Sequence, residues 1–154
     1  MSRFLFCLSF LLVSSSVSLA QACDTNEVVH LLNLILHTSK HNDFLLASKP
    51  ESTDKVRVFI FNHDSLSVHS CLDSNFRWKK EMIKSEGVTL KNSDTANEKK
   101  CMYVSLPIFS VDHDTCMISV SESDGEWGGY GALYFFERKR GKWRFVKKNV
   151  CWVS

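Results

Sequence analysis

The C-terminal third of the chain, from Cys101 onward, is a series of short strand patterns separated by turn residues. Residues 116–121 alternate apolar with other side chains, the period of two that is typical of a strand with one buried face. Residues 131–137 and 143–148 each contain several aromatic side chains and are predicted strands, and Gly141 between them can adopt the positive φ of a tight hairpin. Successive strands joined by short turns predict an antiparallel meander.

A helix pattern near the N-terminus supplies a cover for such a sheet. Asp24 and Glu27 have the spacing of a helix N-cap and its reciprocal capping partner. One apolar stripe follows, with the i, i+3, i+4 and i+7 spacing of a helix: Val28, Leu31, Leu32 and Ile35. The pattern extends to about Ser39. We therefore predict an α+β fold in which this N-terminal helix packs on a curved antiparallel β-meander.

The middle of the chain is less decisive. Residues 56–61 (VRVFIF) predict a strand that is covered on both faces. Residues 73–86 are compatible with a short helix or with a pair of strands, and residues 42–49 are ambiguous. Residues 91–100 are polar and lack an apolar anchor, which predicts an exposed loop.

The first residues have the layout of an export signal. Arg3 precedes an almost unbroken apolar stretch at residues 4–13, and small residues ending in Ala20-Gln21-Ala22 follow. The apolar stretch is shorter than the roughly 20 residues that a membrane span needs. We expect residues 1–22 to be a cleaved signal peptide and residues 23–154 to form a single α+β domain.

Cys23 directly follows the expected cleavage site. The segment Leu19-Ala20-Gln21-Ala22-Cys23 resembles a bacterial lipobox, although its leucine stands four residues before the cysteine rather than three. Ordinary cleavage would release a secreted or periplasmic protein. Acylation of Cys23 would instead anchor the domain to a membrane surface without a spanning segment.

The remaining cysteines suggest disulfides in an oxidising compartment. If Cys23 carries lipid, Cys71, Cys101, Cys116 and Cys151 can form two bridges. In an antiparallel meander Cys101 and Cys116 would lie about 14 Å apart, whereas a disulfide needs Cα atoms within about 7 Å. Two pairings remain open: Cys71–Cys101 with Cys116–Cys151, or Cys71–Cys116 with Cys101–Cys151.

Charge and motif content exclude several classes of function. Beyond the leader, the chain carries 18 Lys and Arg (19 less Arg3) against 17 Asp and Glu, which gives no electrostatic argument for a nucleic-acid partner. The basic run at 138–142 is interpreted as a solvated hairpin turn. The sequence contains no C-x-x-C, H-E-x-x-H or G-x-S-x-G motif. We therefore assign no catalytic residue, metal ligand or cofactor.

Three local groups of polar residues have structural explanations. His30, His37 and His41 have helical spacing but lack a further metal ligand, so a solvated helix end is favoured. The adjacent residues of Asp112-His113-Asp114 are typical of a turn, where side chains seldom face one another. His63-Asp64 has the same weakness. None of these groups predicts a catalytic site.

The Gly128-Gly129-Tyr130-Gly131 segment is the most distinctive of the chain. It leads into a strand rather than a helix, so it offers no helix N-terminus for a phosphate. The favoured interpretation is a bulge or sharp bend in the sheet. The alternative is a binding rim formed by Trp127, Tyr130 and Glu126, with exposed aromatic area beside acidic side chains.

The C-terminal third also resembles a family of exported bacterial proteins that have no assigned activity. The pieces that carry the resemblance are residues 105–110 (SLPIFS), the 128–131 turn, Leu133-Tyr134, residues 141–143 (GKW) and residues 152–154 (WVS). It covers about 50 residues and implies an exported domain, without transferring a catalytic residue. In such proteins the glycine turn often contains cysteine, which is lacking here.

These observations favour a non-enzymatic exported domain, of inhibitor or immunity type, that binds an envelope or extracellular protein. A small hydrolase or ligand-binding domain with a pocket in the concave sheet is the alternative. A structural envelope lipoprotein is a further one, and it requires acylation of Cys23. A membrane partner is expected only through that anchor.

Overall fold

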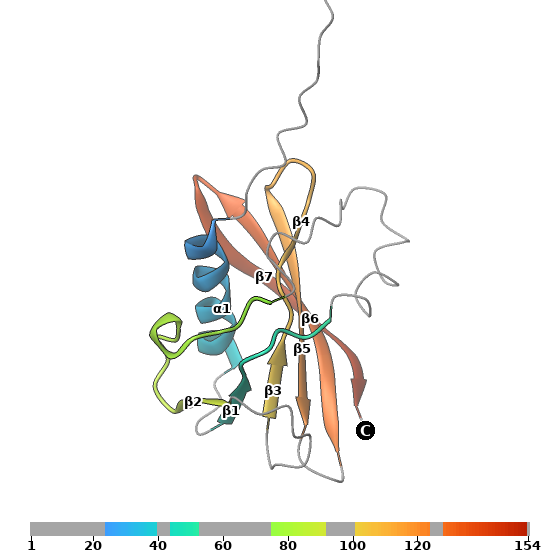
Figure 1. Ribbon diagram of the computed structural model, residues 1–154. Coiled ribbons are helices and arrows are strands. Elements are labelled where there is room, and N and C mark those ends of the chain that lie inside the picture. The colour runs from blue at the N-terminus through green and yellow to red at the C-terminus, as the bar shows by residue number, and fades with distance from the viewer. Residues whose placement is uncertain (1–23, 40–43, 53–74, 92–100, 124–127, 154) are drawn as a thin grey trace, which may run out of the picture.

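The computed structural model (Figure 1) describes residues 24–39, 44–52, 75–91, 101–123 and 128–153. These residues form one α-helix, one 3-10 turn and seven strands, an α+β arrangement that is mostly sheet. The elements are α1 (Thr25–Ser39), β1 (Phe44–Ala47), η1 (Lys80–Met82), β2 (Val88–Lys91), β3 (Cys101–Val104), β4 (Ile108–Phe109), β5 (Thr115–Ser123), β6 (Gly129–Lys139) and β7 (Lys142–Val153).

The sheet is mixed rather than wholly antiparallel. Its strand order is β2-β1-β3-β5-β6-β7, and β4 pairs with β5 outside this path. The part from β5 to β7 is the predicted meander, but β1 runs parallel to both β2 and β3. Parallel pairing needs a crossover of a dozen residues or more, and the chain between β1 and β2 is long enough to supply one. The local strand patterns held no information on this direction.

Helix α1 lies against one face of the sheet, as predicted (Figure 1). Its first turn is capped by Asp24, whose side chain accepts a hydrogen bond of 2.9 Å from the Asn26 backbone N–H. The predicted apolar stripe is its buried face, extended by Leu36. This stripe packs with buried side chains of β5 and β6: Cys116, Ile118, Val120, Ala132, Tyr134 and Phe136.

Within its described residues, the segment before β2 forms neither the short helix ending at Gly87 nor the strand pair that the sequence allowed. Between residues 75 and 87 its only regular element is the single turn η1, and Asn33 of α1 holds it in place. The Asn33 amide donates to the Met82 carbonyl at 2.8 Å, and its oxygen accepts from the Lys84 N–H at 2.7 Å. Trp78 beside it is buried in the main core. The side chain of Asn33, rather than a regular helix or strand, therefore holds this segment against α1.

Predictions were also made for residues 42–49, for the loop from Lys91 onward and for residues outside the described ranges. The ambiguous residues 42–49 contain β1. Lys91, the first residue of the predicted exposed loop, instead ends β2 and is buried, and the rest of that loop lies outside the described residues. The leader, Cys23, the predicted strand at 56–61 and Cys71 lie outside the described residues. Within the described ranges, no helix has the length and apolar character needed to cross a membrane.

Candidate functional site

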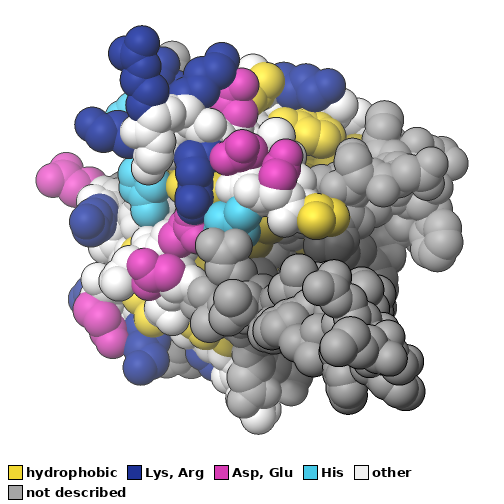
Figure 2. Space-filling view, turned by 90° about the horizontal axis from the view of Figure 1, so that it is seen from above, with side chains coloured by type: hydrophobic (Ala, Val, Ile, Leu, Met, Phe, Trp, Pro, Cys, Tyr) yellow, Lys and Arg dark blue, Asp and Glu magenta, His cyan; other side chains and the backbone are white. Residues whose placement is uncertain are grey.

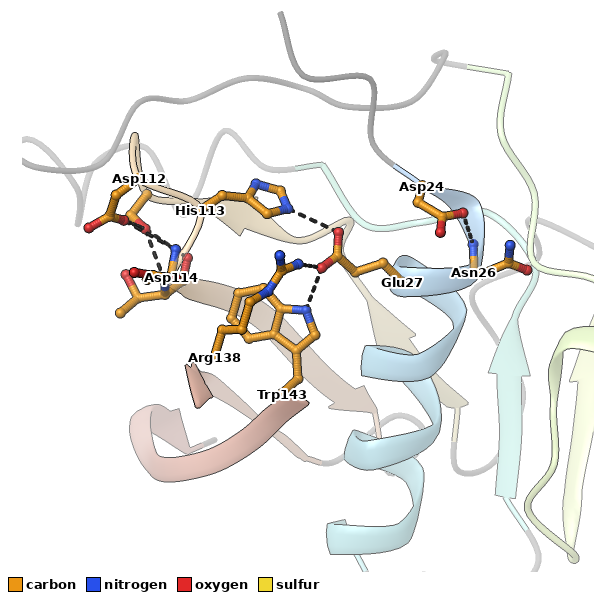
Figure 3. Close-up of polar contacts among 10 residues, drawn as sticks. Asp24, Asn26, Glu27, Asp112, His113, Asp114, Arg138 and Trp143 are labelled. Carbon is orange, nitrogen blue, oxygen red and sulfur yellow. Dashed lines mark hydrogen bonds and ion pairs between the residues drawn. The ribbon is translucent and has the colours of Figure 1, made fainter. Parts of the chain in front are cut away.

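Glu27, in the first turn of α1, is the centre of a polar cluster (Figure 3). Its carboxylate accepts hydrogen bonds from the Trp143 indole Nε1–H at 2.6 Å and from His113 Nε2 at 2.9 Å. Arg138 forms an ion pair with the same carboxylate. The Glu27 side chain is only 14% exposed, so these charge-assisted contacts lie largely away from water. The sequence predicted that Glu27 would cap the helix, but its side chain turns to the sheet instead.

The β4–β5 turn and the β6–β7 hairpin bring these partners to the helix. His113 lies in the turn between β4 and β5, with φ at 60°, and its ring stacks on Phe109 with centroids 4.1 Å apart. Arg138 and Trp143 face each other across the β6–β7 hairpin, and the Arg138 guanidinium lies 4.8 Å from the Trp143 ring centroid. The helix N-terminus also favours a carboxylate in its first turn. The cluster therefore joins α1 to two separate turns of the sheet.

The acidic neighbours of His113 do not orient it. Asp112 accepts from the Ser110 hydroxyl at 2.5 Å and from the Asp114 N–H at 3.2 Å, which shapes the turn. The Ser110 hydrogen bond, followed by that of the Asp114 backbone, lowers the pKa of the exposed Asp112 carboxyl. The carboxylate partner of His113 is Glu27, 86 residues away in the chain. Sequence spacing could not reveal this pair.

This end of the molecule, seen from above, carries basic, acidic and histidine side chains around the middle of its described surface (Figure 2). A histidine held by a carboxylate can act as a general base when a nucleophile lies beside its other nitrogen. The Glu27 carboxylate instead contacts donors from three side chains, which suits a structural role in holding α1 to the sheet. Among the described residues, no group of three or more His, Cys, Asp and Glu could hold a metal ion. His30 and His37 are exposed on α1.

Tyr130 is the member of the predicted binding rim that the structure describes; Trp127 and Glu126 lie outside the described ranges. Its hydroxyl donates to Glu122 at 2.5 Å and accepts from the Lys148 ammonium at 3.1 Å. Burial, then the hydrogen bond to Glu122, raises the pKa of the Tyr130 phenol well above its usual range. Tyr130 therefore remains a neutral donor that links β5, β6 and β7.

The glycine segment matches its structural interpretation. A shift of the β6–β7 register falls between Gly131 and Ala132, where β7 carries one extra residue, Cys151. The indole of Trp152 lies against Gly131, and a Cβ at this position would clash with the Trp152 Nε1. Gly131 is thus needed for the close approach of an aromatic ring from β7, a partner that the sequence pattern did not indicate.

Strand β7 exposes an unusual amount of apolar side chain. Of the six large apolar residues that are exposed in the described chain, five lie in its last nine residues: Phe145, Val146, Val150, Trp152 and Val153. We call these five residues the β7 surface. Trp152 is 44% exposed and Val153 is 75% exposed. The strand also carries four cations and no acid: Lys142, Arg144, Lys147 and Lys148. The sequence predicted strand here, but not that its apolar side chains would lack cover.

The three described cysteines, Cys101, Cys116 and Cys151, are free thiols. Cys101 opposes Ser123 on β5 and Cys116 lies seven residues from Ser123, so these two are about 24 Å apart, as their exclusion as a pair required. Cys101 and Cys151 are three strand spacings apart, about 14 Å, and Cys116 and Cys151 are separated by a similar distance along the strands. Each predicted pairing contains one of these two bridges, and neither bridge forms.

Comparisons with known proteins add no relative. No protein-family model matches the chain, and neither curated proteins nor solved structures show a significant match to it. The resemblance to exported bacterial proteins stays an expectation from the sequence.

Proposed function

We propose that this chain is an exported, non-enzymatic binding protein of inhibitor or immunity type that engages a protein partner through the β7 surface. In this proposal the leader at 1–22 is removed and residues 23–154 act as one domain. Helix α1 then covers the antiparallel meander and leaves its last strand free to bind. Cys23 is acylated or not according to the cleavage route.

The concentration of exposed apolar side chains on one strand is the observation that carries the proposal. Monomeric soluble proteins seldom gather large apolar side chains on a single exposed element unless that element meets a partner. Tryptophan and phenylalanine are also typical anchors of protein interfaces. Phe145 and Trp152 stand at the two ends of the β7 surface, with valines beside them. A flanking set of cations would supply the polar rim.

The Glu27 cluster supports a binding role rather than catalysis. Its carboxylate is used by Trp143, His113 and Arg138 together, and the ring of His113 is stacked on Phe109. A rigid connection of helix and hairpin suits a domain that presents a preformed surface, since preorganisation reduces the ordering cost of association.

Partner capture with matched variants tests the proposal. The protein, tagged at its C-terminus and purified after export, is used to capture proteins from the envelope and extracellular fractions of its own host. We expect one stoichiometric partner, and we expect Phe145→Ser with Trp152→Ser to lose it. Val111→Ser is the control, because Val111 is an exposed apolar residue of the β4–β5 turn and is not part of the β7 surface. Equal capture by the double variant and the control would reject the proposal.

Intact mass of the exported protein tests the compartment. It reports the cleavage site, any lipid on Cys23 and the oxidation state of the thiols in one measurement. Full-length protein found only in the cytoplasm would contradict export.

A further inference from the structure

We infer that the partner contributes an extended acidic segment, which adds as a further strand to the open edge of β7. This inference rests on the proposed function and specifies how the partner binds and what chemistry it carries. Addition of a strand at a sheet edge obtains affinity from main-chain hydrogen bonds and specificity from alternate side chains.

The position of β7 in the sheet is the first argument. Strand β7 is the last in the strand order and, within the described chain, pairs with β6 only. It runs for 12 residues without a proline, so it offers an edge about 40 Å long. Such an edge carries a row of backbone N–H and C=O groups that can pair with another extended chain.

The distribution of side chains over both faces is the second argument. Phe145 and Lys148 oppose Phe136 and Tyr134, so they lie on the face that α1 covers. Trp152 and Lys147 oppose Gly131 and Phe135, so they lie on the other face. The exposed anchors and the cations are therefore divided between the two faces. A partner bound to one face would contact only part of these side chains, whereas a strand added at the edge would contact side chains on both faces.

The positive charge of β7 indicates which kind of segment binds at its edge. Lys147 is held with its ammonium 4.9 Å from the Phe135 ring centroid, and Lys148 is held 4.4 Å from that of Tyr130. With Lys142 and Arg144, the strand carries four cations and no acid. A second copy of β7 would bring like charges together, which is unfavourable between neighbouring strands. A segment with Asp or Glu at two neighbouring positions would instead face a cation on each side of the sheet.

The bulges define the register of this site. Val146 and Cys151 are the extra residues at the two register shifts between β6 and β7. The regular stretch between them is residues 147–150. We therefore place the main-chain ladder of the added strand on these four residues. Acidic side chains would lie beside the two lysines, and apolar side chains at its ends would contact Phe145 and Trp152.

Selection of peptides tests the inference without knowledge of the natural partner. The purified protein is panned against a random dodecapeptide phage library, and enriched peptides are synthesised and titrated by fluorescence anisotropy. We expect peptides with neighbouring acidic residues flanked by apolar residues, and we expect them to bind more weakly as salt rises. Lys147→Glu with Lys148→Glu should weaken binding at least tenfold. Lys79→Glu with Lys80→Glu, at exposed lysines beside η1, should change it less than twofold. Matching thermal unfolding midpoints establish that both variants are folded.

Backbone methylation separates strand addition from side-chain docking. N-methylation of one alternate set of peptide amides should abolish binding, while methylation of the other set, whose N–H groups point away from β7, should leave it. Equal binding by both sets, enrichment of basic or neutral peptides, or no enrichment would overturn the inference, as would a dimer formed through β7. If capture of the natural partner still depends on Phe145 and Trp152 in those cases, the proposed function stands and only the strand-addition mode fails.

Discussion

At the scale of single residues, Glu27 shows how one carboxylate can secure three separate segments. Its partners lie 86 to 116 residues away in the chain, in the β4–β5 turn and the β6–β7 hairpin. A carboxylate that is 14% exposed and fully paired contributes mainly by satisfying donors that would otherwise be buried alone.

We predict that Glu27→Gln lowers the free energy of unfolding by about 2 kcal/mol, because Arg138 loses its counter-charge and Trp143 or His113 faces an amide N–H. Urea denaturation followed by circular dichroism measures this. Glu81→Gln, at an exposed position in η1, should stay within about 0.5 kcal/mol of the unchanged protein. Equal stability of the two variants would show that the contacts of Glu27 do not stabilise the packing of α1 on the sheet.

Thiol chemistry gives a second residue-scale prediction. Burial raises the pKa of the Cys116 thiol far above its usual range, so it remains protonated at pH 8. Cys151 is exposed on β7. We expect iodoacetamide to modify Cys151 readily in the reduced native protein and Cys116 only after unfolding, as measured by peptide mass spectrometry. Equal rates at the two positions in native protein would contradict the buried placement of Cys116.

At the scale of elements, the join between β6 and β7 depends on a glycine and an indole from different strands. Gly131 leaves room for Trp152, and the register shift next to it places Trp152 over the glycine. A ring that covers a glycine in this way shields the strand backbone from water. The same indole is a proposed anchor for the partner.

We predict that Gly131→Ala destabilises the protein by about 1–3 kcal/mol, because the new Cβ forces the Trp152 ring away. In a Trp152→Ala background the same substitution should cost much less, giving a coupling of about 1 kcal/mol or more in a double-mutant cycle. Gly141→Ala is the control. It is strained by a φ of +74° but has no atom within 4 Å of its Cβ, so its cost should be independent of Trp152. Additive effects at Gly131 and Trp152 would mean that the ring is not held there.

At the scale of the whole molecule, charge is distributed unevenly. Residues 23–154 are nearly neutral, with 18 basic against 17 acidic residues, yet β7 carries four cations and no acid. Lysines and bulges on an edge strand are devices that discourage pairing with a second copy. Strand β7 has both, at Lys147 and Lys148 and at its two register shifts.

We predict that neutralising Arg144, Lys147 and Lys148 to glutamine promotes self-association, because the β7 surface then keeps its apolar residues without like-charge repulsion. Sedimentation velocity over the micromolar range should show a monomer for the unchanged protein and larger species for the variant. The same three changes combined with Phe145→Ser and Trp152→Ser should restore the monomer. A monomeric triple variant would show that these cations do not prevent self-association at the β7 edge.

The stripe of α1 and the strands of the C-terminal part could be predicted from the residue pattern alone, because side-chain periodicity records which face of an element is buried. Tertiary structure alone decided the parallel pairing of β1, the partners of Glu27, the separation of the cysteines and the lack of cover over β7. Those features depend on contacts between residues far apart in the chain. The residues of β7 predict a strand, but whether a neighbour covers its apolar side chains depends on how the remaining elements pack.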